Sequence, residues 1–276
     1  MINGTGNRMT QEITRQSRMA ANIALKQAQV STGKRLQRAS DDPMAMARVA
    51  QLKIAQSNDL ARTANVNIGA ALTAQADTQL KTVSNLLART KELTVAGANG
   101  VLSAADRAIL ASEIRSMADE IDAIAATTSM TGQPLFAQGN PIAIRFDDST
   151  VFAPVPGRAE IFAPGGMSIS QSMRDAASAI STGNSANIGA SLATIDDAVD
   201  HSADMLAKVG LHAVRIDRLR ESSALRTINL TEERSMLEDT DLSAAIAELN
   251  GMTLTLEAAQ AAFARINRRT LMDFLS

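Results

Sequence analysis

Few side chains in this sequence are of the types that perform chemistry, and those few are scattered. The chain of 276 residues contains two histidines, His201 and His212, and it has no cysteine, tyrosine or tryptophan. The eleven positions between the histidines correspond to about three helical turns, so one helix cannot bring both rings to one metal ion. We expect both histidines to be solvated, and we predict no enzyme activity, no metal site and no cofactor.

Two pairs of adjacent aspartates are the next candidates, and both favour structural roles. Asp42 directly precedes Pro43, an order that is typical of a helix start, so we predict that these two residues form a helix cap. Asp147 and Asp148 precede Ser149 between two short apolar runs. The other oxygen ligands of a calcium loop are missing there, which favours a solvated turn over a calcium site.

Two further patterns resemble ligand sites only superficially. Gly33-Lys34 has the glycine–lysine order of a phosphate-binding loop, but the first glycine of that motif is missing and Arg35 replaces its Ser or Thr. Nucleotide binding is therefore rejected. An acidic cluster indicates a solvated face and a helix start near Asp241 rather than a metal site; its members are Glu232, Glu233, Glu238, Asp239 and Asp241.

Composition narrows the fold class and the partners. Aromatic residues are only 2% of the chain, so large side chains that fill a thick core are scarce. The net charge of −2 gives no electrostatic reason to expect nucleic acid or an anionic membrane as a partner. We also expect no cleaved signal peptide and no membrane insertion, because the first ten residues lack an apolar region and no run approaches about 20 apolar residues.

Helical periodicity covers most of the sequence and is interrupted once. It predicts helices near 9–30, 43–96, 103–124, 169–180 and from about 186 onward. Five of the six prolines fall in the interruption at 134–166, where residues 142–146 and 150–152 are predicted to form a β-hairpin, and 159–162 a further short strand. An insert this small cannot form a core of its own, so we expect it to pack against the helices.

Both ends of the chain carry apolar stripes that need a partner helix. Apolar residues in each end alternate in steps of three and four, the spacing of a coiled-coil seam. If the two terminal helices pair, each covers the apolar stripe of the other. The alternative is that both stripes pack on the middle of the chain. The predicted assembly interface consists of Met9, Ile13, Ile23, Val30, Leu242, Leu249, Met252, Leu256, Phe263, Ile266 and Phe274.

The predicted fold class is mainly α. It is an elongated antiparallel helical bundle, with a coiled coil of the N- and C-terminal helices and a small β-hairpin insert. Three domains are expected: a terminal coiled-coil assembly domain of residues 1–40 and 241–276, a helical rod of 41–133 and 167–240, and a β-rich outer insert of 134–166.

The order of several motifs resembles the bacterial flagellin superfamily. Ser31-Thr32-Gly33-Lys34-Arg35 and Ser40-Asp41-Asp42-Pro43 follow the first helix, and the helical run from Leu87 to Gly100 comes later. Asp106-Arg107, Thr131-Gly132 and Leu135-Phe136 come next, before the terminal helix. The likeness covers nearly everything except about 134–167, and order and spacing together make it specific.

Two classes within the superfamily compete for this sequence. Hook–filament junction proteins typically carry Ser-Asp-Asp-Pro and close on Leu-Leu-Asp-Phe-Leu, similar to Asp41-Asp42-Pro43 and to the ending from Leu271 to Leu275 here. Filament flagellins usually continue their paired aspartates with Ala-Ala-Gly. The start, with Asn3-Gly4-Thr5 after Ile2, departs from the junction pattern, so filament flagellin stays open as the alternative.

The resemblance implies a structural subunit of the flagellum that joins the hook to the filament. It implies self-assembly into a ring or tubular layer through the terminal helices, with hook-associated protein 1 and flagellin as neighbours. It also implies an export chaperone and secretion by the flagellar type III system. A more remote alternative is a helical coiled-coil signalling or needle-type protein.

Overall fold

The computed structural model describes the backbone of residues 2–275 and the side chains of residue 7 and residues 9–265. This part of the chain is 78% helical, with seven α-helices and a small antiparallel sheet of two strands, which confirms the predicted fold class. Contacts divide the chain into two compact units. We call Met1–Ser57 with Thr227–Ser276 the terminal unit and Asn58–Arg226 the central unit.

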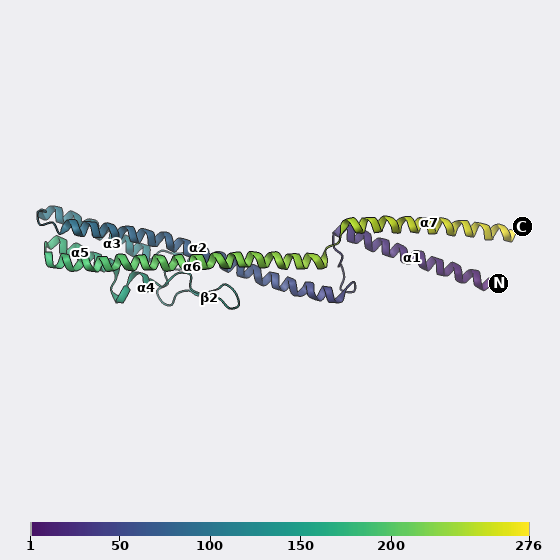
Figure 1. Ribbon diagram of the computed structural model, residues 1–276, viewed down its shortest axis with the longest axis horizontal. Coiled ribbons are helices and arrows are strands. Elements are labelled where there is room, and N and C mark those ends of the chain that lie inside the picture. The colour runs from purple at the N-terminus through teal and green to yellow at the C-terminus, as the bar shows by residue number, and fades with distance from the viewer. Residues whose placement is uncertain (1, 276) are drawn as a thin grey trace. The chain divides into compact units, whose positions relative to one another are not determined.

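The elements follow one another in a simple order (Figure 1). In sequence they are α1 (Ile2–Thr32), α2 (Pro43–Gly97), α3 (Ala104–Ala125), β1 (Ile144–Arg145), β2 (Val151–Phe152), α4 (Arg158–Phe162), the 3₁₀ turn η1 (Pro164–Gly166), α5 (Ile169–Thr182), α6 (Ser185–Glu238) and α7 (Leu242–Leu275). Within the described residues, no helix is both long and apolar enough to span a bilayer.

The terminal unit contains α1 and α7, which run side by side in opposite directions (Figure 1). It also holds the connectors beside them, together with the beginning of α2 and the end of α6. A small core of Leu36, Ala45 and Val49 lies next to the connector that follows α1. Few large apolar side chains are fully buried here, because each terminal helix contacts its partner along one stripe only.

The central unit contains the main core. Segments of α2, α3, α5 and α6 pack together, and α3 lies along α5. Small alanines allow the helices to approach closely, and branched side chains fill the space between them. The largest fully buried side chains of this core are Leu80, Leu87, Ile114, Ile121, Phe136, Ile161, Ile169, Met173, Ile180 and Ile195.

Local capping explains where the central helices begin and end. The hydroxyl of Ser103 accepts a hydrogen bond from the backbone N–H of Asp106, whose carboxylate accepts from the Ser103 backbone, so α3 starts with a capping box. Helix α5 ends at Gly183, which adopts a left-handed conformation with φ of 68°. Arg107 packs against this glycine, and an added Cβ would lie 3.2 Å from its guanidinium carbon.

The predicted hairpin is present, whereas the further strand is not. Ile144 pairs with Phe152 and Arg145 with Val151 in antiparallel register. Residues 159–162, expected as a strand, instead belong to the short helix α4. The prediction was wrong because four residues are too few to separate a strand period from a helical turn. Burial of the adjacent Ile161 and Phe162 in the main core decides the conformation.

Candidate assembly surface

Helices α1 and α7 pack along one stripe of each helix. The less exposed residues of each recur in steps of three and four, the spacing of a coiled-coil seam, and we call these two stripes the terminal seam. On α1 the stripe runs through Glu12, Gln16, Met19, Ile23, Lys26 and Val30, and beside it Ala28 is half-buried and Gln29 is buried. On α7 the stripe runs through Ala245, Leu249, Met252, Leu256, Ala259 and Phe263.

The terminal seam includes some of the predicted interface residues and leaves others outside. Ile23 is buried and Val30 is half-buried, and the predicted α7 positions from Leu249 to Phe263 are half-buried. Met9, Ile13 and Leu242 lie off the seam and are 44%, 53% and 46% exposed. On α1 the less exposed stripe runs through Glu12 and Met19, whereas the apolar spacing of the sequence predicted a stripe through Ile13 and Ala20. The side chains of Ile266 and Phe274 lie outside the described residues.

A second set of apolar side chains on the two helices faces outward. They are large, and in the described part of the chain they remain 42–68% exposed. They are Met9, Ile13 and Leu25 on α1, and Leu242, Ile246 and Leu254 on α7, and we call them the outer apolar set. Such an exposed set on a paired helix marks a surface suited to further helices.

A cluster of charges joins the connectors at the base of this helix pair. The Glu238 carboxylate, with a side chain only 6% exposed, lies 3.1 Å from Lys34 Nζ and 3.2 Å from Lys53 Nζ. Arg234 Nε lies 3.5 Å from it. We call these four residues the Glu238 clasp. Burial raises the pKa of Glu238, but the Lys34 and Lys53 ammonium groups outweigh burial and hold the pKa below its ordinary value.

The clasp corrects the expectation that the acidic cluster is a solvated face. Glu232, Asp239 and Asp241 are exposed as expected, but Glu238 is buried and paired. The sequence signal for it was weak, since only Arg234, four residues earlier on α6, lies near it along the chain. The expected helix start near Asp241 is present, because the Asp241 carboxylate accepts a hydrogen bond of 3.0 Å from the Ala244 backbone N–H.

Backbone hydrogen bonds reinforce the clasp. The N–H of Arg35 donates to the Glu238 carbonyl at 2.7 Å, and the N–H of Thr240 donates to the Gly33 carbonyl at 2.9 Å. Gly33 has φ of 69°, a left-handed conformation that glycine adopts without steric cost. The connector after α1 is therefore paired directly with the connector before α7.

The adjacent aspartates between α1 and α2 both bind backbone groups. Asp42 accepts a hydrogen bond of 3.0 Å from the backbone N–H of Ala45, and Pro43 is the first residue of α2. The Asp41 carboxylate accepts from the backbone N–H groups of Arg38 and Gln37, and these bonds lower the pKa of Asp41. Both carboxylates are engaged in shaping the loop and the helix start.

In the central unit the β-hairpin is held against α2 and α6 by polar and aromatic contacts. Arg62 of α2 pairs with Asp148 at 2.6 Å. The Phe146 ring stacks on Phe152, and the guanidinium of Arg215 lies 4.3 Å from the Phe152 ring centroid. The turn itself is shaped by Asp147, whose carboxylate accepts from the backbone N–H groups of Ser149 and Thr150.

The two histidines are not simply solvated, which corrects the expectation. Nε2 of His201 lies 2.8 Å from the carbonyl oxygen of Glu160, and Nδ1 of His212 lies 2.9 Å from that of Pro154. Both side chains anchor the segment after the hairpin to α6. Their bonding to the backbone could not be predicted, because it depends on how the insert folds back onto the helix.

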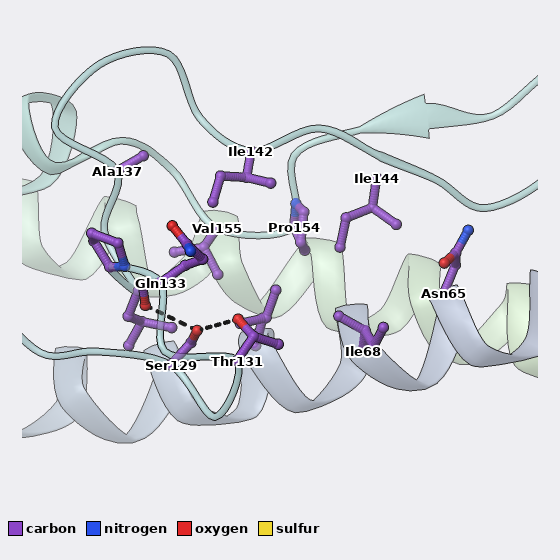
Figure 2. Close-up of a pocket in the computed structure, with 13 residues that line it drawn as sticks. Asn65, Ile68, Ser129, Thr131, Gln133, Ala137, Ile142, Ile144, Pro154 and Val155 are labelled. Atoms are coloured by element: carbon purple, nitrogen blue, oxygen red, sulfur yellow. Dashed lines mark hydrogen bonds between the residues drawn. The ribbon is translucent and has the colours of Figure 1, made fainter.

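A cavity of about 200 Å³ lies between α2 and the insert (Figure 2). Ile68, Ile142 and Ile144 supply apolar walls, and the Ser129 hydroxyl is hydrogen-bonded to the Thr131 hydroxyl and to the Gln133 carbonyl. No titratable side chain lines this cavity. Among the described residues, no group of three His, Asp or Glu side chains could hold a metal ion. The cavity is therefore lined by apolar and neutral polar side chains.

Comparison with known families matches both ends of the chain. Residues 5–140 match the family model described as the bacterial flagellin N-terminal helical region. Residues 192–275 match the bacterial flagellin C-terminal helical region. Apart from the first residues of α1, the terminal helices and the Glu238 clasp therefore lie inside the matched segments.

Curated relatives include filament and hook-associated proteins. The flagellar filament 30.7 kDa core protein of Treponema maltophilum is 23% identical over 249 residues, covering 86% of each chain. The flagellar hook-associated protein 3 of Escherichia coli (strain K12) is 33% identical over 109 residues, covering 40% of this chain and 34% of the relative. The chain thus spans about a third of this second relative.

Solved structures share the fold. A structure described as a flagellar hook-associated protein from Vibrio parahaemolyticus matches with a TM-score of 0.65 at 21% identity, over 72% of this chain and 99% of that one. Xanthomonas campestris FlgL matches with a TM-score of 0.58 at 16% identity, over 67% of this chain and 99% of that one.

Proposed function

This chain belongs to the bacterial flagellin superfamily, and we propose that it is a structural subunit of the flagellum at the junction between hook and filament. Members of this superfamily are structural proteins rather than enzymes, and they act outside the cell as flagellar components. The observation that carries the proposal is the outer apolar set on α1 and α7, within the segments that match the two flagellin models.

Assembly through these helices follows from the physics of apolar burial. A helix pair that exposes six large apolar side chains gains free energy when neighbouring copies cover them, at about 25 cal/mol per Å². Copies that pack side by side with a constant rotation between neighbours build a ring or a tubular layer, and this is the assembly we propose. We propose hook-associated protein 1 and flagellin as the neighbouring axial proteins.

The junction role is supported over a plain filament role by particular residues. Asp41-Asp42-Pro43 and the ending at Leu271 to Leu275 resemble the junction class, and hook-associated protein 3 is among the relatives. Filament flagellin is the second candidate, since the relative from T. maltophilum that covers 86% of this chain is a filament core protein. We further propose that an export chaperone holds the chain and that the flagellar type III system secretes it.

Deletion of the gene tests the junction role. The expected result is that hooks remain, filaments are missing and flagellin monomers accumulate in the culture medium, because exported flagellin has no junction layer on which to assemble. The measurement combines electron microscopy of the cell surface with immunoblotting of the medium. If filaments vanish and no flagellin monomer is found in the medium, the chain is itself the filament protein and the junction proposal fails.

A further inference from the structure

The terminal seam specifies the alignment of α1 with α7 only weakly. Three of the six α1 positions in it are polar or charged, namely Glu12, Gln16 and Lys26. The side-chain nitrogen of Gln16 is buried, and it has no hydrogen-bond partner among the described residues, so it favours no particular alignment. An ion pair between Lys26 and Glu248 at 2.6 Å does link the two helices, but the Glu248 side chain is 47% exposed and such a pair contributes little, so the seam must obtain most of its alignment from elsewhere.

The α7 side of the seam also repeats after seven residues. A shift of one heptad exchanges Leu249 for Leu256 and Leu256 for Phe263, so an apolar residue again meets α1 at five of the six positions, and Thr270 takes the sixth. At 1.5 Å per residue such a shift displaces the helices by about 10 Å while leaving the apolar contact largely intact. Registers one heptad apart are therefore close in energy as far as the seam is concerned.

The Glu238 clasp, in contrast, exists in one alignment only. Lys34 follows the end of α1 by two residues, and Glu238 precedes the start of α7 by four. Its carboxylate holds cations from the connector, from α2 and from α6, and the backbone bonds between Arg35 and Glu238 and between Thr240 and Gly33 add to it. Sliding α1 along α7 would separate these groups.

We propose that Glu238 is a positioning residue that sets the register of α1 against α7. Without its charge, the cations of Lys34, Lys53 and Arg234 face one another with no carboxylate between them, so the connectors separate and the helices shift. This inference rests on the proposed function. In a shifted pair the α1 and α7 members of the outer apolar set would be displaced relative to each other, so they would no longer match the surfaces of neighbouring copies.

Cross-linking between engineered cysteines tests the register directly, since the natural chain contains no cysteine. The in-register reporter carries Lys26→Cys and Glu248→Cys, at positions whose natural side chains form an ion pair of 2.6 Å. The shifted reporter carries Lys26→Cys and Thr255→Cys, seven residues further along α7. Both reporters are full-length chains. Each is treated with a short bismaleimide, once as the free chain and once in sheared flagella, and the cross-linked peptides are quantified by mass spectrometry.

Glu238→Gln is expected to lower the ratio of in-register to shifted cross-links about tenfold, whereas Glu238→Asp, which keeps the charge, retains most of it. The matched control is Glu233→Gln. Glu233 lies on α6, as Glu238 does, but it is outside the clasp, and its ion pair is with Arg48 of α2. This substitution should leave the ratio unchanged. Circular dichroism of each variant verifies that its helix content is preserved.

The proposal is overturned if Glu238→Gln leaves the ratio unchanged, or if the parent reporters show no preference for the in-register pair in either preparation. An equal decrease of this ratio in Glu233→Gln also overturns the proposal, because the removal of any acidic side chain would then shift the register. The free chain yields the ratio even if the chain is absent from appendages, so a failed junction role and a failed register role are distinguishable.

Discussion

At the scale of single residues, Gly69 permits a close contact between the hairpin and α2. A Cβ at this position would lie 2.6 Å from Phe146 Cε1 and 2.8 Å from Cζ, closer than carbon atoms can approach. Phe146 is buried in a small core with Val66 and Ile216, so its ring has little room to retreat. A side chain at position 69 must therefore displace the hairpin.

Gly69→Ala is expected to destabilise the central unit by about 1–3 kcal/mol in urea unfolding, because overpacking at Phe146 exceeds the gain in helix propensity. Gly210→Ala on α6 is the matched control. No atom would lie within 4 Å of its new Cβ, so it should stabilise the protein by about 0.5–1 kcal/mol. Equal effects at the two glycines would show that the contact with Phe146 does not restrict position 69.

Asp147 predicts a pH dependence for the hairpin turn. Burial raises the pKa of its carboxyl, but hydrogen bonds from Ser149 and Thr150 outweigh it and lower the pKa from 3.8 to about 2. Because the pKa in the folded state lies below the ordinary value, the stability that Asp147 contributes is fully present above about pH 4. It is lost as the pH falls through about 2.

NMR titration of the Asp147 carboxyl and of the Ser149 and Thr150 amide signals checks this dependence. All three are expected to share a midpoint near pH 2, and Asp147→Asn should abolish that shared inflection while keeping an oxygen that can accept in the turn. A midpoint at the ordinary aspartate pKa would mean that the hydrogen bonds from Ser149 and Thr150 to the Asp147 carboxylate do not form in solution.

At the scale of the elements, α1 and α7 combine two surfaces with different roles. Leu256 lies on the terminal seam, whereas Ile13 belongs to the outer apolar set. Leu256→Asp is therefore expected to disrupt the pairing of α1 with α7. Ile13→Asp should keep the pair and block only its packing between copies, since a charge on the outer set must be desolvated there.

Both substitutions are expected to leave export intact and to reduce incorporation into flagella at least about tenfold, a factor that corresponds to about 1.4 kcal/mol. Immunoblots of the medium and of sheared flagella measure export and incorporation, and hydrogen exchange of α1 distinguishes the two mechanisms. Thr255→Asp, at an exposed polar position beside Leu256, is the control. Normal incorporation of the Leu256→Asp chain would refute the role of the seam.

At the scale of the whole molecule, the two units differ in how much apolar surface they bury. The core of the central unit contains Leu80, Ile114, Met173 and Ile195, all essentially inaccessible to solvent. Along α1 and α7, only Ile23 and Ala245 are buried apolar residues among the described side chains. Local opening is cheapest where few apolar contacts are lost.

Hydrogen exchange of the free chain is accordingly expected to be fastest in α1 and α7 and slowest in α3 and α5, with protection differing by at least about tenfold. Mass spectrometry of peptides after timed exchange measures it. The control is the same measurement in assembled flagella, where contacts between copies should slow α1 and α7. Equal protection of all four helices in the free chain would contradict the expected difference between the units.

The sequence by itself determined the helices, their caps and the presence of a seam at each end. These depend on neighbours within about four residues, as with Ser103 and Asp106 or Asp42 and Ala45, so local spacing is sufficient. Residues 159–162 were missed because a four-residue segment carries too little of this local information.

Only the tertiary structure decided which side of α1 meets α7 and what surrounds Glu238. Two heptad grids on α1, the predicted one and the observed one, share Gln16, Ile23 and Val30, so which of them faces α7 is decided only when the partner helix is in place. Lys34 is 204 residues away from Glu238 along the chain. Pairing over that distance is fixed by how the connectors fold together, because no local spacing encodes contacts between residues so far apart.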